Sequence, residues 1–457
     1  MRNLTTAAAA AALLSMPVLA QEHAPPAEVL AVHDYVAAVS ADRIGQDIQT
    51  LADFGTRHTL SETQSDTRGI GAARRWIHDE FERISAECGG CLEVIYVSDT
   101  ISGERRIPEP TEVVSVIAIQ RGTLDPDRFV MMSGDIDSRV TDPLDGTSDS
   151  PGANDNASGM AGVIEAARVL SQHEFAGSII YAGLSGEEQG LFGGRIVAAH
   201  ALEQGWRIKG VLNNDMISNI AGINGVIDNT TARVFSEGTR YVETEEEARQ
   251  RRFTGGEVDS PSRNLARFVD RTADQYIPNL DVMMVYRLDR FGRGGHHRPF
   301  NEAGMPGVRI METNEHYDRQ HQDLRTEDGR VYGDTMDGVD AGHAAKLTAL
   351  NVAVMAQMAG APPFPANVEI EGAVQPSTTL RWDMAEGEAA GNLAGYRVHW
   401  RLTDQPQWQW SRFVGRVGEY TLENVVIDNY YFGVSAVATD GSETPVVFPG
   451  PAGSFGD

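Results

Sequence analysis

The first 360 residues alternate amphipathic helical stretches with short apolar runs. Ser40 can cap a helix that places Ile44, Ile48 and Leu51 on one face. Further helices are predicted at 68–85, after Ser158, at 191–202 and at 341–358, and strands at 92–97, 113–119, 129–132, 179–184, 208–212, 282–286 and 308–311. Such alternation predicts an α/β domain with a mostly parallel or mixed sheet flanked by helices. The polar, charge-rich stretch 229–265 predicts an exposed insertion or flap.

The pattern changes after a proline-rich linker at 361–365. Residues 362–457 alternate apolar and polar positions over short runs, which predicts an all-β sandwich domain following a domain at 21–361. Trp382 and Tyr396 lie where a fibronectin type III domain keeps core aromatics, and Leu422 with Tyr430 resembles its tyrosine corner. The resemblance implies a spacer or adhesion module with a protein or surface partner.

Composition limits the function classes. The 457 residues include 65 acidic and 38 basic side chains, for a formal net charge of −27. Nucleic-acid binding needs a basic footprint, so we expect no nucleic-acid partner. The acidity indicates a solvated surface, or more weakly a field that attracts cationic substrates such as a free peptide amine.

The N-terminus has the pattern of a secretory signal peptide at residues 1–20. Arg2 supplies the positive end, residues 7–14 the apolar core, and residues 18–20 the small-residue cleavage site. The apolar core is too short to span a membrane, and no later stretch is long enough. We therefore expect a secreted or periplasmic protein.

The two cysteines, Cys88 and Cys91, allow three interpretations. In an exported protein a tight structural disulfide is favoured. A redox-active pair lacks a thioredoxin-like surrounding pattern, and a structural zinc site lacks a second pair of Cys or His at matching spacing.

Acidic residues follow predicted strands at three places. Glu187-Glu188 come just after the 179–184 run, Asp215 follows the 208–212 run, and Asp155 lies in the Gly-Ala-Asn-Asp-Asn-Ala-Ser-Gly stretch 152–159. Open α/β sheets bind ligands outside the carboxyl ends of their strands. Adjacent buried carboxylates need a cation or a shared proton. The sequence thus predicts a metal-binding crevice, and carboxylates with one or two imidazoles suit zinc or a similar divalent ion.

These motifs, with His297–Gly304 and His321 further on, appear in the order found in the M28 metallopeptidases, and the chain resembles that family of secreted dinuclear-zinc aminopeptidases over residues 40–360. The resemblance implies two divalent ions, most simply zinc, bridged by Asp155. Glu188 and His321 would complete one ion's ligands and Asp215 would bind the other. Glu187 would be the general base. An unusual backbone state is expected at Asp155-Asn156.

One position departs from the family pattern. The family usually has His-x-Asp at the end of the third strand, where this chain has Asp135-Ile136-Asp137. Residues two apart on a strand face the same way, so both carboxylates can point at the site. We expect Asp135 to be a metal ligand. Asp137 is expected to lie behind the ligands as one of the catalytic residues. An all-oxygen shell at that ion would admit manganese, magnesium or calcium more readily.

Basic residues near the site suggest substrate contacts. His297 matches the family's histidine near the substrate, and Arg293 could bind a substrate carboxylate, although solvent exposure or a salt bridge explains an arginine as well. His296 stands where an Asp is common. It is either a surface loop residue, the favoured interpretation, or a replacement for the imidazole missing at Asp135.

Together, these motifs and the resemblance predict an exported metal-dependent exopeptidase that acts on a peptide substrate, and they favour an aminopeptidase. Alternatives are a carboxypeptidase or another amidohydrolase on the same metal core, and a non-catalytic binding protein with a degenerate site. Serine chemistry has little support, because Ser185 lacks the Gly-x-Ser-x-Gly elbow.

Overall fold

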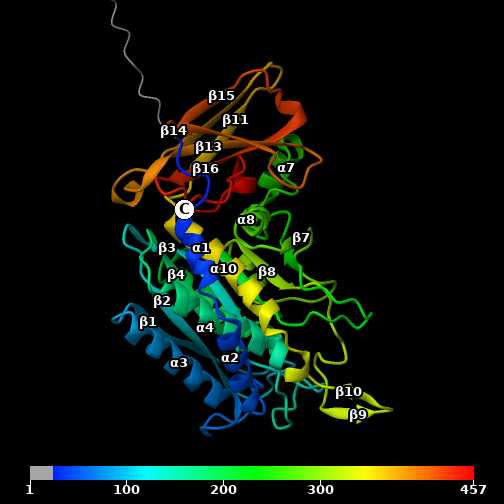
Figure 1. Ribbon diagram of the computed structural model, residues 1–457. Helices are drawn as coiled ribbons and strands as arrows, with labels where there is room; N and C mark the ends of the chain where they lie inside the picture. Colours follow the sequence, from blue (N-terminus) through cyan, green and yellow to red (C-terminus); the bar gives the residue numbers. More distant parts are fainter. Residues whose placement is uncertain (1–23, 457) are drawn as a thin grey trace, which may run out of the picture.

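The computed structural model describes residues 24–456, which form two parts packed against each other (Figure 1). The first part contains an eight-stranded sheet with the order β1-β2-β4-β3-β5-β8-β6-β7. Parallel pairing joins β3 to β4 and β5, β5 to β8, and β6 to β7, whereas β1–β2, β2–β4 and β6–β8 are antiparallel. The predicted mixed α/β sheet is confirmed. The strands are β1 (Leu92–Ile101), β2 (Thr111–Gln120), β3 (Asp125–Asp135), β4 (Gly177–Leu184), β5 (Arg207–Asn214), β6 (Thr231–Phe235), β7 (Asp281–Val285) and β8 (Gly307–Glu312).

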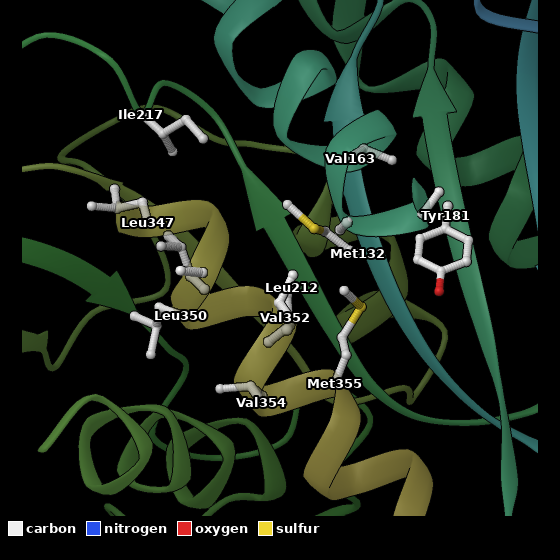
Figure 2. Packing of buried hydrophobic residues seen from close by; sticks show 14 of the residues in the cluster. Met132, Val163, Tyr181, Leu212, Ile217, Leu347, Leu350, Val352, Val354 and Met355 are labelled. Atoms are coloured by element: carbon white, nitrogen blue, oxygen red, sulfur yellow. The ribbon is translucent and has the colours of Figure 1, made fainter. Parts of the chain in front are cut away.

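Helices cover both faces of this sheet. One face packs against α10 (Ala341–Gly360), α4 (Gly159–Leu170), α3 (Gly69–Glu87) and α8 (Pro261–Tyr276). Outside this layer, α1 (Leu30–Ala37) lies on α10, and α2 (Ala41–Asp53) lies on α10 and α4. Figure 2 shows Val352 and Met355 of α10 near Leu212 of β5, and all three belong to one buried cluster with Met132 of β3. The other face packs against α6 (Phe192–Glu203) and α9 (His297–Glu302). The central strands are therefore buried on both sides, which explains their continuous apolar runs.

The predicted flap at 229–265 is wrong in part. Strand β6 lies inside the sheet between β8 and β7, and Asp259 and Arg263 are buried. Within the stretch, α7 (Glu245–Thr254) has no buried residue and begins with a Thr244/Glu247 capping box. The charged run thus forms a surface helix, while the residues on either side of it belong to the body of the domain.

Two other expectations concern the chain ends and the cysteines. The predicted signal peptide lies outside the described residues. Across residues 24–456, no helix is both long and apolar enough to cross a membrane.

Cys88 and Cys91 form a disulfide between the end of α3 and the start of β1, which confirms the favoured interpretation.

The second part is a sandwich of two three-stranded antiparallel sheets that share one core. Trp382 and Tyr396 meet in that core with ring centroids 5.5 Å apart. The sandwich begins with β11 after α10 ends. The predicted domain boundaries and the likeness to a fibronectin type III domain stay predictions. Its strands are β11 (Ala366–Glu371), β12 (Thr378–Asp383) and β15 (Glu419–Leu422) in one sheet and β13 (Leu393–Leu402), β14 (Trp410–Gly415) and β16 (Tyr430–Ala438) in the other.

Buried ion pairs join the two parts. Asp259, just before α8, accepts hydrogen bonds from Arg267 of α8 at 2.9 Å and from Arg401 of β13 at 2.8 and 2.9 Å. Arg267 also donates to the carbonyl of Pro406 at 2.6 Å. All three charged side chains are at most 1% exposed. The sandwich is therefore docked on the α/β domain rather than tethered to it.

Candidate metal centre

The predicted site residues gather at the carboxyl edge of the central strands. Asp135 is the last residue of β3, Glu187 begins α5 (Glu187–Gly190) three residues after β4, and Asp215 follows β5 directly. Asp155 comes from η1 (Ala153–Ser158), the turn that leads into α4, and His321 from the loop after β8. Because β3, β4 and β5 are parallel, their carboxyl ends meet at one edge and bring these side chains together.

Three donors converge there. Ligand atoms of Asp155, Glu188 and His321 all lie within 4.8 Å of one another. His321 Nε2 is 3.0 Å from Asp155 Oδ2 and 2.8 Å from Glu188 Oε1. Two carboxylates and one imidazole around a common centre form the three-ligand set of a catalytic zinc site, which leaves a further position open. The residues present therefore fit one zinc ion.

Asp334, which is not one of the three donors, holds the backbone at Asp155 through hydrogen bonds. The amides of Asn154 and Asp155 donate to Asp334 Oδ1 and Oδ2 at 2.9 and 2.6 Å. The Asp155–Asn156 peptide bond is cis, in agreement with the expected unusual backbone, and the Asp215–Met216 bond is cis as well. Asp334 thereby fixes the direction in which the Asp155 carboxylate points.

Arg139 supports the other two donors. Its Nε donates to Glu188 Oε2 at 2.7 Å, and a terminal nitrogen lies 2.8 Å from His321 Nδ1. Burial alone would raise the pKa of Glu188, but His321 and Arg139 hold that pKa well below its usual range. Burial would lower the pKa of His321, but Glu188 and Asp155 raise it to about 9. In the absence of an ion, His321 therefore carries a proton at the place where an ion would bind.

Glu187 stands beside this group with its backbone anchored. The amides of Glu187 and Glu188 donate to Asp137 Oδ1 and Oδ2 at 3.2 and 3.1 Å, and Thr59 Oγ1 donates to Oδ2 at 3.3 Å. Burial, followed by Glu188 and Asp215, raises the pKa of Glu187 well above its usual value. Asp137 therefore positions Glu187 and Glu188 from behind, as a carboxylate at the start of α5.

Asp135 and His296 contact each other. His296 Nδ1 lies 2.5 Å from Asp135 Oδ1, and Asn156 Nδ2 donates to Asp135 Oδ2 at 2.8 Å. His296 is fully buried, so the interpretation as a surface loop histidine is wrong. Its ring pairs with Asp135 and lies outside the three-donor group.

Asp215 and His297 also have protein partners. Arg309 of β8 lies with a terminal nitrogen 2.8 Å from Asp215 Oδ2. His297 is fully buried, and its Nε2 lies 2.8 Å from the carbonyl of Leu288, with Asp289 Oδ2 at 3.8 Å. Neither His296 nor His297 lines the cavity over the donors, whereas Arg293 does.

That cavity has a volume of about 650 Å³ and unusually basic walls. Asp155, Glu187, Glu188, Asp215 and His321 are on its floor. Several arginines have carboxylate partners, such as Arg298 with Glu302 at 2.7 Å. In a chain with a net charge of −27, this is a local concentration of positive charge. The arginines of the lining are Arg105, Arg106, Arg139, Arg195, Arg290, Arg293 and Arg298.

Sequence reasoning missed the residues that support the donors. Arg139, Arg309 and Asp334 carry no motif of their own, and an arginine within an apolar strand such as β8 gives no sign of its partner. One usable signal exists for Arg139, which lies two residues after Asp137 and hence close to the carboxyl end of β3.

Comparison with known proteins identifies the family of this chain. The fold and the donor set define an α/β protein with a candidate zinc site at the carboxyl edge of its central strands. Residues 115–341 match the model of Peptidase family M28. A probable zinc metalloprotease of Leptosphaeria maculans is 42% identical over 429 residues, which cover 94% of this chain and 98% of that protein. This chain belongs to peptidase family M28.

Two further likenesses agree. A probable zinc metalloprotease of Pyrenophora teres f. teres is 42% identical over 420 residues, covering 91% of this chain and 86% of that protein. The crystal structure of the Legionella pneumophila LapA aminopeptidase shares the fold with a TM-score of 0.51 and 21% identity, covering 72% of each chain.

Proposed function

We propose that this protein is an exported zinc-dependent exopeptidase in which Glu187 is the general base. The main support is that ligand atoms of Asp155, Glu188 and His321 lie within 4.8 Å of one another, in the same cavity as Glu187. The probable zinc metalloproteases that it resembles support zinc as the ion. The disulfide at Cys88–Cys91 supports export, since such bonds persist in oxidising compartments.

The residues divide the chemistry among them. Zinc, when bound by Asp155, Glu188 and His321, polarises the scissile carbonyl or lowers the pKa of a water. Glu187 takes the proton of the attacking water and later returns it to the leaving amine. Its raised pKa suits a group that must hold a proton between these steps. Asp137 keeps Glu187 in place through the two backbone amides.

Glu187→Gln tests the assignment most simply. The amide keeps the shape of the side chain and cannot take a proton, so turnover is expected to fall about 10²–10⁴-fold, with zinc content unchanged. Glu203→Gln, an exposed position on α6, is the matched control and should retain wild-type turnover. Wild-type activity in Glu187→Gln would exclude this mechanism. Absent peptidase activity in the zinc-loaded wild type would instead favour a non-catalytic binding protein.

Both ends of the peptide substrate are candidates for the site of cleavage. The family resemblance favours the N-terminus and hence an aminopeptidase. Of the seven arginines around the cavity, Arg139, Arg290, Arg293 and Arg298 are paired with carboxylates of the protein. The other three favour a carboxypeptidase, because guanidinium groups bind carboxylates and repel an ammonium. A pair of otherwise identical peptides, one acetylated at the N-terminus and one amidated at the C-terminus, separates these. An aminopeptidase cleaves only the amidated peptide, and a carboxypeptidase only the acetylated one.

A further inference from the structure

The family resemblance implies a second ion near Asp135, but each oxygen of the Asp135 carboxylate already has a buried polar partner. Its Oδ1 lies 2.5 Å from His296 Nδ1, and its Oδ2 accepts from Asn156 Nδ2 at 2.8 Å. Asp135 is 2% exposed and His296 is fully buried. An ion placed here would have to share both carboxylate oxygens with buried polar groups that already contact them.

Asp215, the other ligand implied for that ion, faces a fixed positive charge. A terminal nitrogen of Arg309 lies 2.8 Å from Asp215 Oδ2, and Arg309 Nε donates to the Asp215 carbonyl at 2.7 Å. The second terminal nitrogen donates to the Gly294 carbonyl at 2.8 Å and contacts Asp289 Oδ2 at 3.2 Å. Arg309 is fully buried, so these contacts hold the guanidinium in one place.

The charge of Arg309 acts on the groups that a second ion would serve. An arginine stays protonated at any working pH, so it would repel a divalent cation placed beside it.

The positions of the donors agree with this. Among residues 24–456, Asp155, Glu188 and His321 are the one group of three or more acidic, His or Cys residues whose ligand atoms come within 4.8 Å of one another. No such group includes Asp135 or Asp215. The second half of the centre therefore does not fit a metal ion.

We propose that the centre holds a single divalent ion at Asp155, Glu188 and His321, and that the guanidinium of Arg309 takes the place of the second cation beside Asp215. This inference rests on the proposed function, because it assumes that the three-donor group binds zinc. It differs from the two-ion arrangement that the family resemblance implies. Arg309 acts here as a fixed counter-charge and positioning residue.

Counting bound zinc in the full chain tests the proposal without relying on activity. The protein is loaded with excess zinc, dialysed, and analysed for zinc per chain by mass spectrometry. One zinc per chain is expected, and two would overturn the inference while leaving the proposed function intact. No retained zinc would contradict the proposed function itself, so the two failures are distinguishable.

Variants locate the ion. Asp215→Asn is expected to retain one zinc per chain, whereas His321→Ala is expected to retain none. A loss of one zinc from a total of two in Asp215→Asn would overturn the proposal. Asp135→Asn provides the same comparison if Asp215→Asn does not fold, and circular dichroism of each variant checks folding. The count for the wild type stands regardless of how the variants behave.

Discussion

In the proposed zinc site His321 is the imidazole donor, and it lies between two carboxylates that raise its pKa to about 9. Below that pH the side chain carries an extra proton, which an ion must displace from Nε2. Zinc affinity is therefore expected to fall as pH falls, by close to tenfold per pH unit well below 9, or roughly 50-fold between pH 9 and pH 7. Competition with a chelator of known affinity at several pH values measures this. A pH-independent affinity over that range would contradict the protonation of His321.

The sequence revealed the donors but not their partners. Asp155, Glu187 and Glu188 could be found because each lies in a short motif next to a predicted strand. The contacts of His296 with Asp135 and of Arg309 with Asp215 join residues 161 and 94 positions apart. Such pairs depend on tertiary packing, so spacing along the chain gives no signal of them.

Among the elements, the short helix α5 depends on Asp137. Its carboxylate accepts the amides of Glu187 and Glu188, and Asp137 is 1% exposed. In Asp137→Asn the amide group has one acceptor oxygen for two N–H donors, so one buried donor loses its partner. Unfolding free energy should fall by about 1–3 kcal/mol, and turnover should fall because Glu187 is less well placed.

Urea denaturation and steady-state kinetics of Asp137→Asn measure both effects. Asp127→Asn, an exposed position at the start of β3, is the control and should match the wild type. Unchanged stability and turnover in Asp137→Asn would show that α5 is held by other contacts.

Strands and helices with strong periodicity could be predicted, and β6 could not. The buried strands β3, β4 and β5 are apolar runs, and α2 and α3 have clear apolar faces. Strand β6 spans 231–235 and is followed closely by the charged helix α7. The charge of 243–252 suggested that the whole stretch is exposed, because composition describes the surface helix and not the strand beside it.

At the scale of the whole molecule, Asp259 links the sandwich to the α/β domain. It is fully buried between Arg267 and Arg401. Asp259→Asn would leave two buried guanidinium groups with no counter-charge from this position, which is expected to cost about 3–5 kcal/mol of unfolding free energy. Thermal and urea denaturation measure the loss. Asp404→Asn, exposed on the sandwich, is the control, and an Asp259→Asn protein as stable as this control would contradict the interface described here.

The two-part organisation was predictable from the change in periodicity at the 361–365 linker, but the docking was not. Contacts between Asp259 and Arg401 cross 142 positions of sequence. The proline-rich linker alone suggested a separate module, whereas buried ion pairs make the sandwich part of one folded body.

The central claim is that one imidazole and two carboxylates hold zinc beside Glu187. Extended X-ray absorption fine structure of the zinc-loaded protein tests this ligand set directly. The expected spectrum shows one imidazole together with oxygen donors at about 2.0–2.2 Å and no sulfur. A zinc shell without an imidazole, or one with two imidazoles because His296 also binds, would contradict the account.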